Sequence, residues 1–523
     1  MRKILCLAIV VTVASFSYAI TPNQPIGPAV GLTQTDTMID SLGIGNVNIV
    51  SDYNIWINPA RVSGIPKKAY AEIWQANTWG GSTIGLPVGT LGVFVGRPYI
   101  GNANAIGSVV RTNDDFNYNT ICCNQLGVNN DWTNPGGATL LADTGITVTG
   151  APATIADIAI LTPNTDLDLF YALPVGPVSV GLRITQAANS AKVSYVYEST
   201  GNFNGDGTIT SDKKSTDMQT AIGATIKDLG PLSGLDVAIA MAAPTVTNSY
   251  SQASYISEAT LIGKYGQGVA KDLTGTANVK SNTASNMSIL VRGTIGKDDG
   301  NQLIASLMQE TIDVSSQFDF VVDYDSTTSK EFDVTGKYAD KTTGMNISAA
   351  YHTKPADSLK VIYIAGMGSS SRENKYTATD NLSTADDNRN PKGTTDNDTL
   401  TETRSSINLG VALEHQTFKK VKTRIGVTRG IMQTSAVKIA DMDNPIDDDV
   451  AASPLTDSYD RLLKTNTRED TVTTQGPTLV TAGCCIEPTD DIKIDLQFGT
   501  NAIGSANALF IENLARATVS YSF

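Results

Sequence analysis

The stretch NLARATVSYSF, residues 513–523, decides the fold because its side chains alternate in polarity. From Ala515 onward the odd positions are apolar and the even positions are polar, which is the period of a half-buried β-strand. A strand that ends a chain needs a neighbour on each edge, and an outer-membrane β-barrel supplies both by pairing its last strand with its first. We therefore expect an all-β, transmembrane antiparallel barrel. Tyr521 and Phe523 would face lipid and form the C-terminal signal for the barrel-assembly machinery, whereas Arg516 would face the interior.

The first 19 residues have the three parts of a secretory signal peptide. Arg2 and Lys3 form a positive n-region, residues 4–13 form a mostly apolar h-region, and SYA at residues 17–19 is a small-x-small cleavage site. We expect residues 1–19 to be removed during export and the mature chain to lie in the outer membrane of a diderm bacterium. Beyond this segment no apolar run approaches the roughly 18 residues that a spanning helix requires, so the mature chain must cross a membrane as strands.

The mature chain is acidic and carries no catalytic signature. Removing Arg2 and Lys3 from the 38 basic residues leaves 36 against 52 acidic residues, a formal charge of −16. Nucleic-acid-binding domains usually present a basic face, so we expect no nucleic-acid partner. The sequence also lacks the GxSxG, HExxH and Walker A motifs and a Rossmann glycine fingerprint in the right context. We therefore expect neither an enzyme nor a required cofactor.

Alternating segments recur along the chain, and two kinds of connection take turns between them. Short connections such as residues 175–177 and 354–357 carry tight-turn residues, and long polar stretches fall between the short ones. Short periplasmic turns and long external loops are typical of outer-membrane barrels, which leads us to expect an even number of strands, about 14 to 18. The barrel is predicted over residues 68–523, with external loops near residues 98–165, 199–215, 372–403 and 440–470.

Charged residues of both signs occupy the polar positions of the predicted strands. If the apolar positions face lipid, the charged ones face the interior of the barrel. Such a mixture favours either a wet lumen or internal ion pairs. The candidates for the lumen are Arg183, Arg292, Lys360, Glu414, Arg424, Asp495 and Arg516.

Residues 20–67 differ from the rest because they are rich in Gly, Pro, Asn and Ile without sustained alternation. They contain Asn58, Pro59 and Ala60 directly before the first expected strand, and a Leu-Pro/Gly-rich hairpin follows at residues 86–98. This order of parts resembles the FadL-like outer-membrane proteins. The resemblance implies that residues 20–67 fold as a hatch inside the barrel, and that the barrel moves long-chain fatty acids or other hydrophobic compounds. Read alone, Pro59 predicts only a turn that ends an extended segment.

Three functions stay open on these patterns. A channel or transporter for hydrophobic compounds follows from the resemblance, and its apolar pocket could come from the hatch, whose apolar residues could equally form the hatch's own core. A general diffusion porin follows from the charged interior. A structural or adhesive surface protein follows from the long acidic loops. The expected partners are outer-membrane lipid, lipopolysaccharide and a small hydrophobic or polar solute.

Residues 202–212, NFNGDGTITSD, resemble a calcium-binding loop, with Gly207 at the sixth place for a sharp turn. Lys213 occupies the twelfth place, where a bidentate acid belongs. The alternatives are therefore a Ca²⁺ ion in an external loop and a plain Gly/Asn-rich surface turn. The oxygen donors would come from Asn202, Asn204, Asp206, the Thr208 carbonyl, Thr210 and Asp212.

The mature chain has four cysteines in two adjacent pairs, Cys122-Cys123 and Cys484-Cys485. In an oxidising compartment we expect one or two disulfides to join the pairs, with free thiols or a strained vicinal bridge as the alternatives.

Two tryptophans, Trp74 and Trp79, lie on either side of the first expected hairpin connection. Aromatic residues gather at membrane interfaces, so these two are candidates for an aromatic girdle. Packing in a core is the alternative.

Overall fold

The computed structural model describes residues 37–74, 77–97, 147–148, 164–200, 206–256, 271–282, 286–296, 301–323, 330–380, 395–442, 467–474, 478–498 and 514–523. The helical elements are α2 (Thr37–Leu42), η1 (Asn46–Asn48), η2 (Asp52–Ile55) and η3 (Pro59–Gly64). The strands are β1 (Lys67–Trp74), β2 (Asn77–Gly85), β3 (Thr90–Val95), β4 (Thr147–Val148), β5 (Asn164–Val175), β6 (Val178–Thr200), β7 (Asp206–Leu229), β8 (Leu232–Ala242), β9 (Thr245–Ile256), β10 (Lys271–Asn282), β11 (Asn286–Gly296), β12 (Gln302–Asp323), β13 (Lys330–Ala356), β14 (Leu359–Asp380), β15 (Thr395–Phe418), β16 (Val421–Met442), β17 (Thr467–Thr474), β18 (Thr478–Ile486), β19 (Ile492–Phe498) and β20 (Leu514–Ser522).

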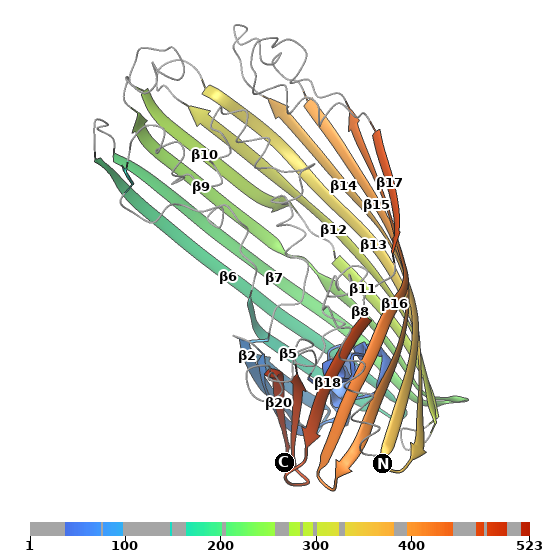
Figure 1. Ribbon diagram of the computed structural model, residues 1–523. Coiled ribbons are helices and arrows are strands. Elements are labelled where there is room, and N and C mark those ends of the chain that lie inside the picture. The colour runs from blue at the N-terminus through green and yellow to red at the C-terminus, as the bar shows by residue number, and fades with distance from the viewer. Residues whose placement is uncertain are drawn as a thin grey trace.

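The sheet closes on itself as a barrel (Figure 1), because the first strand pairs with the last. The antiparallel register runs from Lys68 opposite Ser522 to Trp74 opposite Arg516. Three of the barrel strands are each split into two consecutive segments, and both segments of a strand pair with the same neighbour. These are β8 and β9 along β7, β10 and β11 along β12, and β17 and β18 along β16. The barrel therefore has 16 strands, with β4 outside it as a short pairing on β6. The predicted barrel, its even strand number and the pairing of the last strand are confirmed.

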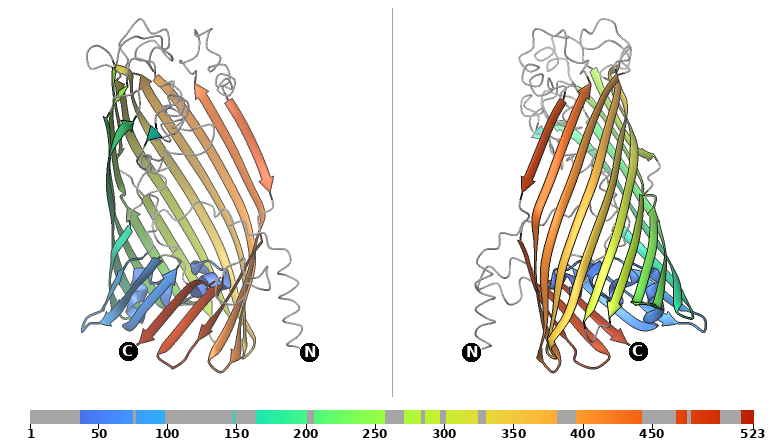
Figure 2. Two further views of the ribbon diagram at one scale, coloured as in Figure 1. Left: turned by 60° about the vertical axis from the view of Figure 1, so that its left-hand side comes forward. Right: turned by 90° about the vertical axis from the view of Figure 1, so that its right-hand side faces the viewer.

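The barrel wall is much longer on one side than on the other. Strands β6, β7 and β12 to β16 have 22 to 27 residues, whereas β1, β2, β3, β19 and β20 have 6 to 9. The short strands lie at the end of the barrel that carries the tight turns (Figure 2), such as residues 176–177 and 419–420. We call this the turn end and the opposite end the loop end. A membrane-spanning strand needs about 9–11 residues, so the long strands extend well past the bilayer.

Strands reach further into the predicted loops than the polar sequence suggested. β6 continues to Thr200 and β7 begins at Asp206, while β14 continues to Asp380 and β15 begins at Thr395. β16 likewise continues to Met442. The predicted bounds of these three loops are therefore too wide. A strand that extends beyond the membrane meets water on both faces, so both faces can carry polar residues. Such a strand lacks the apolar/polar alternation on which the prediction depends.

The two faces of the wall follow the predicted alternation. On the last strand Arg516, Thr518 and Ser520 are buried, whereas Val519 and Tyr521 are exposed, as is Phe523 directly after it. Exposed apolar side chains form an outer band, as lipid requires. Near the turn end the band carries the exposed aromatic residues Tyr171, Tyr351, Tyr363, Phe418 and Tyr521. Among the described residues, no helix is long and apolar enough to span a membrane.

The helical segment at residues 37–64 lies inside the barrel near the turn end (Figure 2). α2 contacts β15, β16 and β18 to β20, η1 contacts β12 and β13, and η3 contacts β3 and β5 to β7. The segment therefore crosses the interior from one side of the wall to the other. We call residues 37–64 the hatch.

Candidate functional site: the hatch and its contacts with the wall

Asn58, Pro59 and Ala60 anchor the hatch to the wall. Asn58 caps η3, because its Oδ1 accepts from the Ala60 N–H at 3.1 Å, and Pro59 occupies the first helical position, which needs no N–H donor. The Asn58 side-chain amide donates to the Ala224 carbonyl at 2.9 Å and to Asp236 Oδ1 at 3.0 Å. The tripeptide is therefore both a helix start and a buried contact with β7 and β8.

Asp236 on β8 is the centre of an ionic cluster that joins hatch and wall. Its carboxylate accepts from Arg61 of η3, with 2.7 Å between Nη2 and Oδ2, and from Arg292 of β11, with 2.6 Å between Nη2 and Oδ2. Arg292 also donates to the hatch, through Nη1 to the Ile49 carbonyl at 3.0 Å and to Asn54 Oδ1 at 3.1 Å. Asp236 and Arg292 are almost completely buried, so each charge depends on the other for compensation.

Two wall glycines let the hatch backbone approach at this point. A Cβ at Gly223 on β7 would lie 2.0 Å from Asn58 Oδ1, and a Cβ at Gly181 on β6 would lie 2.3 Å from the Ala60 nitrogen. No other residue type leaves this space, which explains why both positions are glycine.

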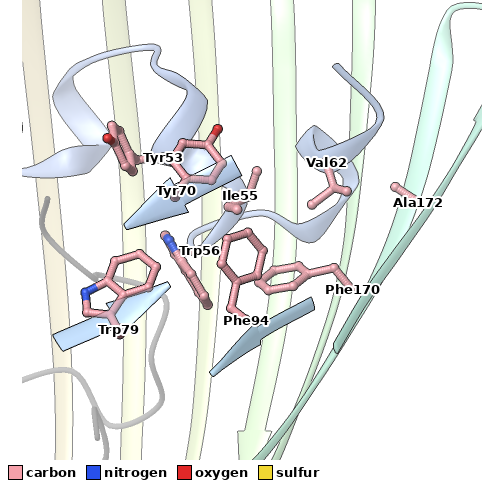
Figure 3. Close-up of a cluster of buried hydrophobic side chains, with 9 residues drawn as sticks. All are labelled: Tyr53, Ile55, Trp56, Val62, Tyr70, Trp79, Phe94, Phe170 and Ala172. Atoms are coloured by element: carbon pink, nitrogen blue, oxygen red, sulfur yellow. The ribbon is translucent and has the colours of Figure 1, made fainter. Parts of the chain in front are cut away.

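An aromatic cluster surrounds Trp56 on the short side of the wall (Figure 3). The ring of Trp56 makes edge contacts with Trp79 of β2, Phe94 of β3 and Phe170 of β5, with centroids 5.0 to 5.7 Å apart. Arg97 lies over the Trp56 ring, 4.4 Å from its centroid. Trp79 is buried, so its predicted place in a membrane girdle is wrong and the core alternative is correct.

Buried charged side chains lie next to this aromatic cluster. Arg97 forms a two-pronged pair with Asp168 of β5 at 2.7 and 2.9 Å, and both side chains are fully buried. Arg183 of β6 donates from Nη1 to the Trp56 carbonyl at 3.0 Å. Arg183 thus faces the interior, as predicted, and binds the hatch backbone there.

The opposite side of the hatch meets the wall through apolar groups. Met38 and Leu42 of α2, with Ile44 and Ile49, pack against inner residues of β13 to β15. α2 also approaches the wall closely, since a Cβ at Gly426 would lie 1.7 Å from the Leu42 carbonyl oxygen. The wall residues of this contact are Ala350, Ile362, Ile364 and Ala412.

A short polar chain fixes η1 beside this apolar contact. His352 Nε2 lies 2.8 Å from the Asn48 carbonyl, and Ser348 Oγ donates to Asn48 Oδ1 at 2.9 Å. Ser306 on β12 extends the chain, with its hydroxyl 2.7 Å from that of Ser348. His352 is therefore a structural hydrogen-bonding group.

The start of the hatch lies over the seam between the first and last strands. Glu72 of β1 pairs with Arg516 of β20 at 2.6 Å and accepts from Trp79 Nε1 at 2.7 Å and from Thr518 Oγ1 at 2.8 Å. Thr37 of α2 lies 2.6 Å from Thr518, hydroxyl to hydroxyl. Arg516 faces inward, and this network ties barrel closure to the hatch.

The remaining lumen candidates lie near the turn end of β14 to β19. Arg424 is buried and pairs with Asp495 at 2.5 Å and with Glu414 at 2.7 Å. Lys360 is half-buried, opposite Glu414 in the register. Arg183 and Arg292 thus bind the hatch, while Arg424 and Arg516 pair across strands, which agrees with the alternative of internal ion pairs.

The predicted calcium loop does not have the expected geometry. Residues 206–212 belong to β7, and Gly207 stands opposite Tyr197 in a regular ladder instead of forming a sharp turn. Asn202 and Asn204 lie outside the described residues. The sharp turn expected at Gly207 is therefore absent, because the backbone of residues 206–212 is extended, whereas the binding of Ca²⁺ stays a prediction.

The second cysteine pair occupies neighbouring positions on β18, where Cys485 is buried and Cys484 is half-buried. Successive strand residues point to opposite faces, which rules out a relaxed bridge between these two. Both are free thiols within the described part of the chain. Cys122 and Cys123 lie outside it, so the predicted bridge between the pairs stays a prediction.

No protein-family model matches the chain, and no curated protein matches it. Among solved structures, the CymD monoaromatic hydrocarbon channel is similar with 9% identity and a TM-score of 0.35, over 95% of this chain and 99% of that one. A Pseudomonas aeruginosa FadL homologue has 10% identity and a TM-score of 0.29, over 95% of this chain and 100% of that one. The FrpB iron transporter from Neisseria meningitidis has 8% identity and a TM-score of 0.26, over 87% and 81%.

At these identities and TM-scores the likenesses carry no argument about what passes through the chain. The order of parts stands on the register and the contacts: 16 antiparallel strands closed around an N-terminal segment. An N-terminal segment folded inside a barrel is the arrangement that the resemblance of residues 58–60 and their surroundings implied.

Proposed function

We propose that the chain is an outer-membrane channel for small hydrophobic compounds, closed at rest by its hatch. The observation that carries the proposal is the pairing of the inward charges. Arg183, Arg292 and Arg516 bind the hatch or a neighbouring strand instead of lining an open pore. A general diffusion porin needs a continuous wet path, whereas here the hatch contacts the wall on opposite sides of the barrel.

The apolar contact between hatch and wall supports a hydrophobic solute. Leu42 and Ile49 of the hatch pack against Ile362 and Ala412 of the wall in an apolar cluster. An apolar solute that enters between them exchanges one apolar contact for another, so the free-energy cost of parting hatch and wall there is small. Beside it, Ser348 donates to Asn48 of the hatch and contacts Ser306 of β12. A solute would pass at the apolar contact, and long-chain fatty acids and small aromatic hydrocarbons are the solute classes to test.

Signal-peptide cleavage after Ala19 and insertion by the barrel-assembly machinery belong to the same proposal. The motivating features are the tripartite segment at residues 1–19 and the exposed aromatic residues Tyr521 and Phe523 at the end of β20.

The test is solute flux through the purified full chain. In planar bilayers the protein should give no stable conductance steps, and in liposomes it should take up a labelled fatty acid or toluene with saturation while excluding sugars of similar size. Discrete ohmic steps from the unaltered chain would overturn the proposal and identify a general porin. Absence of both conductance and uptake would point to a structural surface protein.

A further inference from the structure

The inner face of β11 carries two polar side chains between the hatch and the loop end. Asn286 and Ser288 share this face with Arg292, which binds the hatch, because the three positions are an even number of residues apart. Along the strand, Ser288 lies about 14 Å beyond Arg292 and Asn286 about 20 Å beyond it. The hatch itself lies near the turn end (Figure 2), so a solute that enters at the loop end reaches these two side chains before it reaches the hatch contact at Arg292.

Both side chains are buried, with exposed fractions of 2% for Asn286 and 0% for Ser288. The described residues provide no hydrogen-bond partner for the Asn286 amide, at either Oδ1 or Nδ2, or for the Ser288 hydroxyl. Burial of this kind is unfavourable to folding, since the hydrogen bonds that these groups make with water are lost and not replaced. The two side chains therefore hold donor and acceptor atoms that the fold does not use. We call Asn286 and Ser288 the polar pair.

The polar pair borders an apolar surface on β8. Ala242 stands opposite Asn286 and Ala240 stands opposite Ser288, so both alanines share the inner face with the pair. The two alanines are buried, as is Leu290, which follows Ser288 on the same face of β11. A molecule that bonds to the polar pair consequently lies against methyl groups, which favours an apolar body.

The first charged residues that the register reaches on either side of the polar pair are acidic. Glu310 of β12 is buried and stands directly opposite Ser288. On the other side, beyond β8, Gln219 of β7 donates to the buried Asp217 at 2.9 Å. Arg183 lies one strand further and already donates to the hatch backbone. An anionic group at the polar pair would therefore meet repulsion from carboxylates.

A hydroxyl group matches the polar pair better than other head groups do. Its O–H can donate to Asn286 Oδ1 while its oxygen accepts from the Ser288 hydroxyl. A carboxylate only accepts hydrogen bonds and carries a charge that the flanking acids oppose, and a hydrocarbon offers neither donor nor acceptor. We propose that the polar pair binds the uncharged hydroxyl of an otherwise apolar solute, a phenol or an aliphatic alcohol. This preference rests on the proposed function, within which it selects phenols and alcohols over fatty acids and hydrocarbons.

The test compares three ligands that share one methyl-substituted ring: toluene, 4-methylphenol and 4-methylbenzoate. Equilibrium binding of the radiolabelled compounds to the full chain in lipid nanodiscs is measured near pH 7, where the phenol is uncharged and the benzoate is ionised. Binding to empty nanodiscs is subtracted. We expect 4-methylphenol to bind about tenfold more tightly than toluene, as one or two net hydrogen bonds allow, and 4-methylbenzoate to bind least.

Two substitutions remove the hydrogen-bonding atoms, and a third is the control. Asn286→Leu keeps the shape of the side chain and should abolish the preference for 4-methylphenol over toluene, whereas Ser288→Ala should reduce that preference about threefold. Neither should lower the unfolding temperature of the barrel, because neither side chain has a partner to lose among the described residues. Asn346→Leu makes the same exchange on the inner face of β13, where the side chain is half-buried, and should leave the preference unchanged.

Equal binding of toluene and 4-methylphenol by the unaltered chain would overturn the proposal, because it would mean that water satisfies the polar pair. Tightest binding of 4-methylbenzoate, absence of binding, or equal losses in Asn286→Leu and Asn346→Leu would overturn it as well. A lower unfolding temperature for Asn286→Leu would do the same, since it would indicate a structural role for the amide. The proposed function fails separately: conductance steps in planar bilayers would identify a porin, whereas saturable toluene uptake without preference for the phenol would leave the channel and remove the role of the polar pair.

Discussion

The hatch is held differently on its two sides. On the side of β5 to β11 it is bound by buried charges, with Asp236 between Arg61 and Arg292, and by close backbone contact at Gly181 and Gly223. On the side of β13 to β15 it is bound mainly by packed apolar groups around Leu42. Ion pairs lose their compensation when they separate by a few ångströms, whereas apolar surfaces can part and close again around an apolar guest. The ionic side therefore serves as the fixed attachment, and the apolar side is where a solute would pass.

The strongest way to break this asymmetry is Asp236→Asn. It leaves Arg292 and Arg61 without their shared carboxylate, and removal of one partner from a buried pair typically costs about 3–5 kcal/mol. We expect the hatch to detach, which would appear as proteolysis between residues 37 and 64 and as new conductance in bilayers.

The control for this variant is Asp357→Asn, in the exposed turn between β13 and β14. It changes the formal charge equally and should leave protease resistance and conductance unaltered. An Asp236→Asn protein with an intact, protected hatch would contradict the assignment of the ionic side as the attachment.

Gly223→Ala tests the same side by volume instead of charge. Its Cβ would lie 2.0 Å from Asn58 Oδ1, so the hatch must shift, and overpacking of this kind costs about 1–3 kcal/mol. Gly234→Ala is the matched control, because a Cβ there meets nothing within 4 Å. Hydrogen exchange of the hatch amides should rise in the first variant alone. An unchanged exchange pattern in both variants would mean that the hatch can shift away from Gly223 more easily than its contacts indicate.

Ile362→Val sharpens the comparison from the apolar side. Loss of one methylene from a buried contact costs about 0.5–1.5 kcal/mol, and here the loss falls on the contact that must open. Uptake of a small hydrophobic solute should therefore increase several-fold, while conductance stays low. The control Ile347→Val makes the same change on the lipid-facing side of β13, where Ile347 is 42% exposed, and should leave uptake as it is.

Sequence alternation predicted the faces of the strands but not the partners across the interior. The inward position of Arg516 followed from its place between Ala515 and Ala517, and the closure of the barrel followed from the same segment. The contact between Asn58 and Asp236 joins residues 178 positions apart. Which inward residues share one height depends on register and stagger, and neither is encoded in a period of two.

Two further features lay beyond the sequence for related reasons. Tryptophan is a residue type common at membrane interfaces, and only the contact with Trp56 inside the barrel shows that Trp79 faces inward. Gly181 and Gly223 look like ordinary strand glycines until the hatch backbone lies against them. The turn expected at Gly207 is absent for the opposite reason, because local spacing matched while pairing with β6 and β9 keeps residues 206–212 extended.

The smallest expected effect concerns an ion pair outside the membrane, in the turn after β18. Lys422 donates to Glu487 at 2.8 Å, and this hydrogen bond holds the pKa of the Glu487 carboxyl below its usual value. A lowered pKa contributes stability that is present above the unfolded-state pKa, about 4.3 for glutamate, and is lost as the pH falls through the lower folded value. Glu487→Gln should cost less than about 1 kcal/mol at pH 7, because both side chains are partly exposed. The difference between the two proteins in urea unfolding should shrink once the pH falls below about 4.3, and it should vanish when the Glu487 carboxyl is protonated in the folded protein as well. A loss as large as that of Asp236→Asn would show that exposed and buried pairs contribute alike, and would remove the physical reason for assigning the attachment to the buried side.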